Sequence, residues 1–267
     1  MTNPRAHSMS RDFVWRDASP DKPRRLSPAE IAAFNRDGFV KLEGVFGPDE
    51  IAAVTAAIDP LEAEQDRFVR EKKGGRYYLT DTDAITFTIH LVGKSAVLRG
   101  FAAHPVFQDV CHDLIGDDVR VYWDQSVYKK TEKPRDFPWH QDNGYGFIEP
   151  QQYLTFWLPL VDVDETNGCP WIAPGFHRLG TLEHWITDQG RVCFDDEPQA
   201  VAVPAKAGDA IVFSSLAPHR TGPNLAAGQV RKAYILQYAP DGACVRTPHG
   251  TRTPQDDPVR QFRILGG

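Results

Sequence analysis

The sequence predicts an α+β protein in which helices come first and pack against a β sandwich or barrel formed by the rest of the chain. Two observations lead to this fold class. Apolar residues recur at helical spacing up to about residue 115, whereas short apolar and β-branched stretches separated by turn residues follow from residue 118. No linker divides the 267 residues, so we expect residues 26–267 to form a single domain.

The first 25 residues are predicted to be a flexible arm. They carry several Arg and Pro residues and no apolar core segment. We therefore do not expect a signal peptide in this stretch.

Three helices are expected before residue 118. Ser27–Glu30 has the pattern of a capping box with Pro at the first helical position, and Gly38 is a typical stop. A second helix opens at Pro48 and carries apolar residues at helical spacing, and Pro60 should kink it or split it in two. The third helix is predicted across residues 105–115.

The strand predictions rest on short runs of apolar and β-branched residues that end at turn signals. Residues 71–76 are expected to form an exposed, mobile loop, and residues 77–91 show no clean period. The predicted strands are 39–42, 119–128, 153–161, 171–175, 201–203, 209–214 and 231–239.

Composition argues against several classes of partner. The net charge is −6 and no long basic block occurs, so nucleic acid and anionic membranes are not expected to bind. No run approaches the roughly 20 apolar residues that cross a bilayer. The four cysteines lack metal-type pairing, which favours buried free thiols in a reducing cytoplasm.

The pair His140 and Asp142 is the first candidate for chemistry. Side chains alternate faces in an extended backbone, so the two residues should point the same way. An imidazole and a carboxylate on one face are two of the three ligands of a facial triad, which holds Fe(II) and leaves coordination positions open. About one His-x-acid triplet is expected by chance in such a chain, so the pair is weak evidence alone.

A second stretch supplies partners for that pair. His219 follows a predicted strand and could be the third ligand, although a strand-end histidine bonded to backbone is the simpler interpretation. Arg231 opens the last strong strand, where its guanidinium could bind a carboxylate in a bidentate manner. Thr221 could add a hydroxyl to the same anion. The simpler interpretation of Arg231 is a solvated basic pair at a strand end.

Several motifs in order resemble the phytanoyl-CoA dioxygenase family over roughly residues 27–240. That family consists of Fe(II)- and 2-oxoglutarate-dependent oxygenases built on a double-stranded β-helix (jelly-roll) core. The resemblance implies this fold, with packed N-terminal helices. The motifs are Trp139–Asp142, Leu154–Leu160, Glu165–Pro170, Pro174–His177, Gly208–Phe213 and His219 through Asn224 to Arg231.

The resemblance also implies roles for particular residues. The triad of His140, Asp142 and His219 would bind iron. Arg231 would bind the distal carboxylate of 2-oxoglutarate with help from Thr221, and Lys232 is the fallback because the spacing from His219 looks one residue long. The further cosubstrate contacts implied are Trp157 and Gln125.

Other positions near these motifs carry weaker implications. The resemblance makes His177 a structural turn residue rather than a ligand. Phe176 stands where the family usually has Ser, and Pro170-Trp171 stands where a larger aliphatic residue is usual. These departures concern a loop near the site and leave the ligand set intact.

The implied reaction is the hydroxylation, or another oxidation, of a C–H bond in a small organic molecule, such as a natural-product intermediate. O2 and 2-oxoglutarate are consumed, and succinate and CO2 are released. Halogenating relatives lack the carboxylate, so Asp142 favours hydroxylation. The alternatives are a jelly-roll metal enzyme that does not use 2-oxoglutarate, such as an isomerase or hydrolase, and a non-catalytic binding protein.

Two groups of residues are candidates for contact with the substrate. One is aromatic or histidine, although such residues belong more often to a core: Tyr77, Tyr78, Phe87, His90, Tyr145 and Phe147. The other is basic and would suit an anionic substrate, although a solvated loop is the simpler interpretation: Lys72, Lys73 and Arg76.

Overall fold

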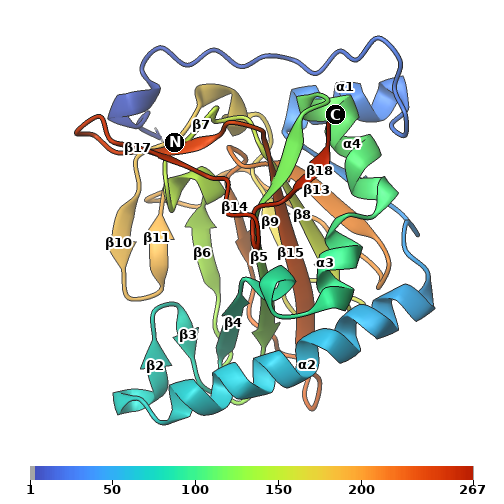
Figure 1. The fold of residues 1–267 in the computed structure, drawn as a ribbon. Helices are drawn as coiled ribbons and strands as arrows, with labels where there is room; N and C mark the ends of the chain where they lie inside the picture. The colour runs from blue at the N-terminus through green and yellow to red at the C-terminus, as the bar shows by residue number, and fades with distance from the viewer. Residues whose placement is uncertain (1–3, 267) are drawn as a thin grey trace.

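Two antiparallel sheets face each other in the computed structural model, which describes residues 4–266 (Figure 1). The larger has the order β1-β13-β8-β15-β5-β4-β3-β2, with β18 also paired to β5, and the smaller has the order β12-β9-β14-β6. The strands of the larger sheet are β1 (Phe39–Leu42), β2 (Arg76–Tyr77), β3 (Thr80–Asp81), β4 (Ile85–Ile89), β5 (Val119–Lys129), β8 (Leu154–Pro159), β13 (Ala210–Ser214), β15 (Arg231–Pro240) and β18 (Arg263–Leu265). Those of the smaller sheet are β6 (Phe137–His140), β9 (Pro170–Ile172), β12 (Val201–Ala202) and β14 (His219–Thr221).

Short peripheral strands complete the β structure. A two-stranded sheet pairs β10 (Trp185–Thr187) with β11 (Gly190–Val192), and a three-stranded sheet joins β7 (Ile148–Glu149), β16 (Cys244–Arg246) and β17 (Arg252–Pro254). The helices are α1 (Pro28–Asp37), α2 (Pro48–Arg70), α3 (Ala96–Ala102) and α4 (Pro105–Ile115). The short 3-10 helices are η1 (Ser8–Ser10), η2 (Lys73–Gly75), η3 (Leu91–Gly93), η4 (Asp142–Gly144) and η5 (Phe176–Leu179).

Alternation along the central strands gives the larger sheet two apolar faces. On β8 and β15, Phe156, Leu236 and Tyr238 point outward and pack with residues of the helices. Their sequence neighbours Trp157 and Ile235 point inward to a second cluster that also contains residues of the smaller sheet. The predicted β sandwich with packed helices is therefore confirmed, and the inward face is available to build a site.

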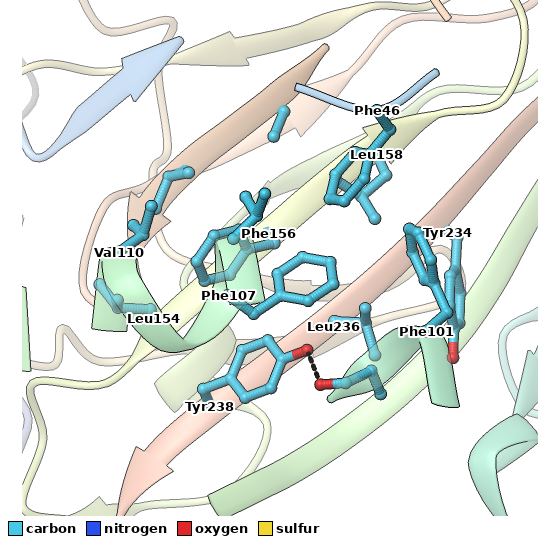
Figure 2. Packing of buried hydrophobic residues seen from close by; sticks show 14 of the residues in the cluster. Phe46, Phe101, Phe107, Val110, Leu154, Phe156, Leu158, Tyr234, Leu236 and Tyr238 are labelled. Atoms are coloured by element: carbon cyan, nitrogen blue, oxygen red, sulfur yellow. Dashed lines mark hydrogen bonds between the residues drawn. The ribbon is translucent and has the colours of Figure 1, made fainter. Parts of the chain in front are cut away.

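The outer core is aromatic at its centre. Figure 2 shows the ring of Phe107, from α4, lying between Phe156 of β8 and Tyr238 of β15. Its ring centroid lies 5.0 Å from that of Phe156 and 5.4 Å from that of Tyr238. The Tyr238 hydroxyl donates to the Ala102 carbonyl at 2.8 Å, the dashed line in Figure 2. Helices α3 and α4 are thus fixed to the outside of the strands that line the site.

Local signals at α1 act as expected, whereas Pro60 does not split α2. Ser27 caps α1 and forms a reciprocal capping box with Glu30, and Gly38 ends the helix at φ +84°. Helix α2 runs through Pro60 instead of splitting there. Pro60 and Ala56, whose carbonyl loses its helical partner, are both exposed, so water can satisfy that carbonyl.

Some elements were not expected from the sequence. Strand β4 was missed although its five residues alternate Ile or Phe with Thr. The run is short, and four of the five residues are buried, whichever face they point to. Helix α3 and the strands after residue 240 are short and lack a clear period.

The N-terminal arm follows the surface in an irregular path to α1 (Figure 1). The backbone N–H groups of Arg24, Arg25 and Leu26 donate to the carboxylate of Asp113, which is buried at the C-terminal part of α4. The flexibility of this arm and the boundary at residue 26 stay predictions.

Two expectations from composition can be compared with the structure. All four cysteines are free and buried, as expected. Among the described residues, no helix is both long enough and apolar enough to cross a membrane.

Candidate active site

Strands β6 and β14 bring the candidate metal ligands together. His140 and His219 are directly opposite in the β6–β14 register. The chain remains extended at Gln141, so Asp142, the first residue of η4, points to the same side as His140. One Asp142 carboxylate oxygen lies 3.8 Å from the Nε2 atom of each histidine. Ligand atoms of the three residues all lie within 4.8 Å of one another.

Both histidines have the same local hydrogen bond. Nδ1 of His140 lies 2.8 Å from the Pro138 carbonyl, and Nδ1 of His219 lies 3.0 Å from the Ala217 carbonyl. Because a carbonyl only accepts, each ring carries its proton on Nδ1 and leaves the Nε2 lone pair for a metal. Burial, and then the nearby His219, lowers the pKa of His140 well below its ordinary value, which keeps the ring neutral. Two neutral imidazoles and a carboxylate fit a ferrous ion.

The second oxygen of the Asp142 carboxylate accepts a hydrogen bond from a residue of the larger sheet. Thr155 Oγ1 on β8 donates to Asp142 Oδ2 at 2.5 Å, and Gln237 Nε2 on β15 donates to Thr155 Oγ1 at 3.3 Å. This leaves Oδ1 directed toward the histidines. Sequence reasoning missed Thr155 and Gln237, although Thr155 shares the inward face with Trp157 two residues later, which is a signal that alternation could have provided.

The backbone around the triad is fixed by buried polar groups. The Gln141 side chain donates to the carbonyls of Gly180 and Leu216 at 3.0 and 2.6 Å, and so links β6 to the turn before His219. The Gln141 backbone N–H donates to Nε2 of His184 at 3.0 Å. Burial lowers the pKa of His184 to about 4, which keeps this acceptor nitrogen unprotonated. Both residues were missed from the sequence.

Arg231 is the first residue of β15, and its side chain is buried with most of its hydrogen-bond donors unused. Nη1 donates to the Val127 carbonyl at 3.0 Å, whereas Nε and Nη2 have no hydrogen-bond partner. The guanidinium carbon lies 5.3 Å from the centre of the Trp157 ring. Burial lowers the pKa of Arg231 to about 9, so it is still charged at neutral pH. A buried charge with two free donors fits an anion that accepts both.

Lys232, the fallback for this role, points to the other face of the sheet. Its ammonium binds both carboxylate oxygens of Asp59 at 2.8 Å and lies over the ring of Tyr128. Because neighbouring residues on a strand face opposite ways, only Arg231 can reach the inner face.

The seven residues assigned from the sequence to iron or 2-oxoglutarate all line one pocket between the two sheets. Gln125 lies on β5, where its Oε1 accepts from Trp123 Nε1 at 3.1 Å. Apolar side chains form the rest of the wall. The seven are His140, Asp142, His219, Arg231, Thr221, Trp157 and Gln125. The apolar wall consists of Phe87, Val127, Phe137, Phe213 and Ile235. Thr155 also lines the pocket. The structure therefore brings the seven residues into one pocket, and the role of each residue stays a prediction.

The candidate substrate contacts divide into two groups. Phe87 lines the pocket, and the Tyr145 ring lies 5.4 Å from that of His140. Tyr78 is 88% exposed on the β2–β3 hairpin, and Phe147 packs against His7, so neither lines the pocket. The same holds for Tyr77, which is partly exposed on that hairpin, and for His90, which packs against Trp123.

The basic candidates and His177 lie outside the pocket, and Lys73 is exposed. Lys72 lies over the ring of Phe68, and Arg76 bonds the Asp188 carbonyl and the Asp81 carboxylate. His177 bonds the Asn35 carbonyl at 3.2 Å and packs edge-on against Trp15, as a structural residue would.

Comparison with known proteins gives the family. Residues 34–233 match the model of the phytanoyl-CoA dioxygenase (PhyH) family. The chain belongs to this family. The recognition made from sequence motifs is thereby confirmed, and so is the assignment of the chain as an enzyme of the dioxygenase class.

Named relatives of this PhyH protein match along most of its length. Ectoine dioxygenase of Sphingopyxis alaskensis is 26% identical over 268 residues, covering 90% of this chain and 83% of that protein. Phytanoyl-CoA dioxygenase of Arabidopsis thaliana is 22% identical, covering 82% of this chain and 90% of that protein.

Solved structures agree on the fold. EctD from S. alaskensis, solved with 2-oxoglutarate and 5-hydroxyectoine, superposes with a TM-score of 0.68 at 26% identity, over 94% of this chain and 87% of that one. SnoK, a non-heme alpha ketoglutarate dependent carbocyclase from nogalamycin biosynthesis, has a TM-score of 0.68 at 22% identity, over 85% of this chain and 89% of that one. The predicted jelly-roll core with N-terminal helices is confirmed.

Proposed function

We propose that this PhyH protein is an Fe(II)- and 2-oxoglutarate-dependent hydroxylase of a small organic molecule. It oxidises a C–H bond of that molecule and releases succinate and CO2. His140, Asp142 and His219 bind the iron, and Arg231 binds the distal carboxylate of 2-oxoglutarate, with Thr221, Trp157 and Gln125 around it. Family membership and the donor set of the triad support this assignment.

One observation carries the proposal: Arg231 is 1% exposed and its Nε and Nη2 atoms lack partners in the same pocket as the triad. Leaving a charged donor buried and unpaired is costly unless a ligand completes it. A dicarboxylate that spans the pocket would supply that ligand, with its other end near the triad.

The chain's own residues prepare the pocket for the reaction. Bound Fe(II) and 2-oxoglutarate together activate O2 for oxidation of a C–H bond. The two Nδ1–H bonds orient the histidine rings, and Thr155 holds Asp142 so that one carboxylate oxygen faces them. Phe87, among the apolar residues of the wall, helps exclude water, which favours a small organic substrate beside the triad.

Asp142 favours hydroxylation over halogenation. Halogenating members of the wider group lack this carboxylate, which frees a position for halide, and here the carboxylate is present and held by Thr155. We expect oxygenated product and no chlorinated product when chloride is added. Chloride-dependent chlorination by the wild-type protein would contradict this.

The alternative is a metal enzyme of the same fold that does not use 2-oxoglutarate, such as an isomerase or a hydrolase. The free donors of Arg231 separate the two hypotheses, because such an enzyme has no use for a second anion site at that position.

The deciding experiment is anaerobic addition of Fe(II) and 2-oxoglutarate to the purified protein. We expect the weak visible charge-transfer band of a chelated 2-oxo acid in wild type and its loss in His140→Ala. Succinate release on admitting O2 provides a second measurement. Absence of the band in wild type, or its persistence in His140→Ala, would overturn the proposed function.

A further inference from the structure

The beginning of the chain pairs with a loop that supports the triad. We call residues 5–10 the strap and residues 180–184, the loop with which they pair, the anchor segment. Ala6 and Leu182 form an isolated antiparallel bridge between the two. The strap precedes residue 34, where the family match begins, and lies in the arm that the sequence predicts to be flexible. The bridge gives this part of the arm a defined place beside the triad.

Two backbone hydrogen bonds flank the bridge. The His7 N–H donates to the Thr181 carbonyl at 2.8 Å, and the Glu183 N–H donates to the Arg5 carbonyl at 2.7 Å. In an extended chain the backbone groups of alternate residues point to opposite edges. Thr181 and Glu183 therefore use the edge of the anchor segment that faces the strap, and the residues between and beside them can use the other edge.

The other edge of the anchor segment holds Gln141, which lies between two members of the triad in sequence. Gln141 Nε2 donates to the Gly180 carbonyl at 3.0 Å, and its Oε1 accepts from the Leu182 N–H at 2.6 Å. Its backbone N–H donates to His184 Nε2 at 3.0 Å. Because three hydrogen bonds of Gln141 end on the anchor segment, a shift of that segment would move the backbone that joins two proposed iron ligands.

Buried polar side chains make a second connection from the strap to the triad. The Ser10 hydroxyl donates to Gln151 Oε1 at 2.9 Å, and the same oxygen accepts from the Thr181 hydroxyl at 2.7 Å. Asn143 Nδ2 donates to the Thr181 hydroxyl oxygen at 2.6 Å, and Asn143 follows Asp142 in η4. Ser10 is 3% exposed, and Thr181 and Asn143 are each 1% exposed. Leaving any of these groups unpaired would be costly, so the chain of bonds favours one arrangement.

The anchor segment also lies directly against η4. A side-chain carbon placed on Gly144 would overlap the ring of His184, so only glycine allows this approach. The ring therefore packs on the η4 backbone at the same time as it accepts from the Gln141 N–H. A displacement of the anchor segment cannot leave η4 in place.

We infer that the strap is a positioning element of the iron site, and that docking of the strap and binding of iron strengthen each other. His7, through its backbone N–H, and Ser10, through its hydroxyl, are the positioning residues, and both act through the anchor segment. The inference rests on the proposed function, because it takes the triad as the iron site. Linked equilibria are reciprocal, so the factor that docking adds to iron affinity is also the factor that iron adds to docking.

Trypsin cleavage after Arg5 measures docking in the full-length protein. The Arg5 carbonyl is bonded to Glu183, so this peptide bond is open to a protease only when the strap leaves the anchor segment. We expect anaerobic Fe(II) to slow the cleavage at least about fivefold in wild type and to have no effect in His140→Ala. Cleavage after Lys73, which is exposed, is the reference in the same sample and should not respond to Fe(II).

The reciprocal measurement is the Fe(II) affinity of strap variants. His7 has φ −57°, close to the fixed φ of proline, so His7→Pro removes the N–H donor with little backbone strain. His7→Ala is the matched control, because it loses the same imidazole and keeps the N–H. We expect His7→Pro to bind Fe(II) at least about threefold more weakly than His7→Ala, and to be cleaved faster after Arg5.

Ser10 and Ser8 provide a second matched pair in the same 3-10 turn. Ser10→Ala removes the donor to Gln151, whereas Ser8 is exposed. Ser10→Ala should weaken Fe(II) binding at least about twofold, and Ser8→Ala should bind Fe(II) as wild type does. The melting temperature of each metal-free variant is measured as well. A strap with a purely structural role would lower that temperature and leave the Fe(II) dissociation constant unchanged.

The outcomes separate this inference from the proposed function. Equal Fe(II) dissociation constants for His7→Pro and His7→Ala, or cleavage after Arg5 that does not respond to Fe(II) in wild type, would overturn the inference. Protection by Fe(II) in a His140→Ala protein that has lost the charge-transfer band would do the same. If His7→Pro does not fold, the wild-type cleavage and the serine pair decide. A wild-type protein that binds no Fe(II) would instead overturn the proposed function.

Discussion

His140 and His219 face each other across the β6–β14 pair, with ring centroids 4.1 Å apart. Each directs Nδ1 to the carbonyl two residues before it, so each ring is oriented by the backbone just before it in sequence. The two nitrogen ligands are therefore aligned by short-range backbone contacts, while the register of one strand pair sets their separation.

Ferrous ion should stabilise the folded protein through this pair. A ligand that binds only the native state at 100 times its dissociation constant adds about 2.7 kcal/mol. We expect anaerobic Fe(II) to raise the melting temperature of wild type and to leave that of His219→Ala unchanged. An equal rise in the variant would contradict the assignment of His219 as a ligand.

Thr155 should matter for iron affinity without touching the metal. Thr155→Val keeps the shape of the side chain but removes the bond to Asp142. Partners of this kind typically change metal affinity by about 10- to 100-fold. Equilibrium titration with Fe(II) measures the effect. Thr86→Val is the control. Thr86 is buried on β4, which β15 and β5 separate from β8, and its hydroxyl has no hydrogen-bond partner, so the change should leave iron affinity unaltered.

Arg231 and Lys232 provide a matched pair on opposite faces of β15. Arg231→Ala should raise the 2-oxoglutarate concentration needed for half-maximal succinate release by at least about tenfold, because a charge-assisted bidentate bond is lost. Iron content should stay the same. Lys232→Ala loses the Asp59 ion pair and should not alter the cosubstrate requirement. If Lys232→Ala raised the 2-oxoglutarate requirement more than Arg231→Ala does, the assignment of the two side chains to the inner and outer faces of β15 would be wrong.

The pH dependence of stability should include a contribution from His177. Burial lowers the pKa of His177 from 6.5 to about 4. Between those values the unfolded chain binds a proton that the folded protein excludes, so stability falls as the pH falls from about 6.5 to about 4. From pH 7.5 to pH 5 this amounts to about 2 kcal/mol.

Urea unfolding at the two pH values measures that contribution. His177→Asn should lose less stability than wild type on going to pH 5, even though it starts from a lower stability. His249→Asn, at an exposed position, should behave as wild type. Parallel pH profiles for wild type and His177→Asn would contradict the prediction.

Phe107 should be a large contributor to stability. It is 0% exposed and packs on Phe156 and Tyr238, so Phe107→Ala would leave a cavity between α4 and the sheet. Substitutions of this kind cost about 3–5 kcal/mol. Chemical denaturation measures the loss. Val97→Ala, at a position 52% exposed, should cost far less.

Much of the site could be predicted because its residues follow local rules. Alternation placed His140 and Asp142 on one face, and family motifs supplied His219 and Arg231 with their order along the chain. The residues that support them could not be found this way. The contact of Gln237 with Thr155 arises only when β15 and β8 are paired, and that pairing joins positions far apart in sequence.

The helices and strands also differ in how well local sequence rules predict them. Helix α1 has a capping box and a stop residue, so its limits were evident. Strand β4 alternates Ile or Phe with Thr over only five residues, within a stretch that has no clean period as a whole. It also has buried residues on both faces, so its polar residues do not mark an exposed side. Pro60 is a further case, because the sequence alone predicts that a proline interrupts the helix there. In the structure α2 continues through Pro60, where water can bond the backbone carbonyl that the proline leaves without a partner.

The C-terminal segment lies beyond the family match, which ends at residue 233. Strand β18 nevertheless pairs with the beginning of β5, and β16 pairs with β7, which comes soon after η4. Arg120 and Arg263 both bind Asp241, joining this tail to the edge of the sheet. An expression fragment trimmed at residue 233 would lose most of β15, the strand between β8 and β5, together with β18 at the end of β5. The smallest useful fragment for crystallography or engineering therefore extends through β18.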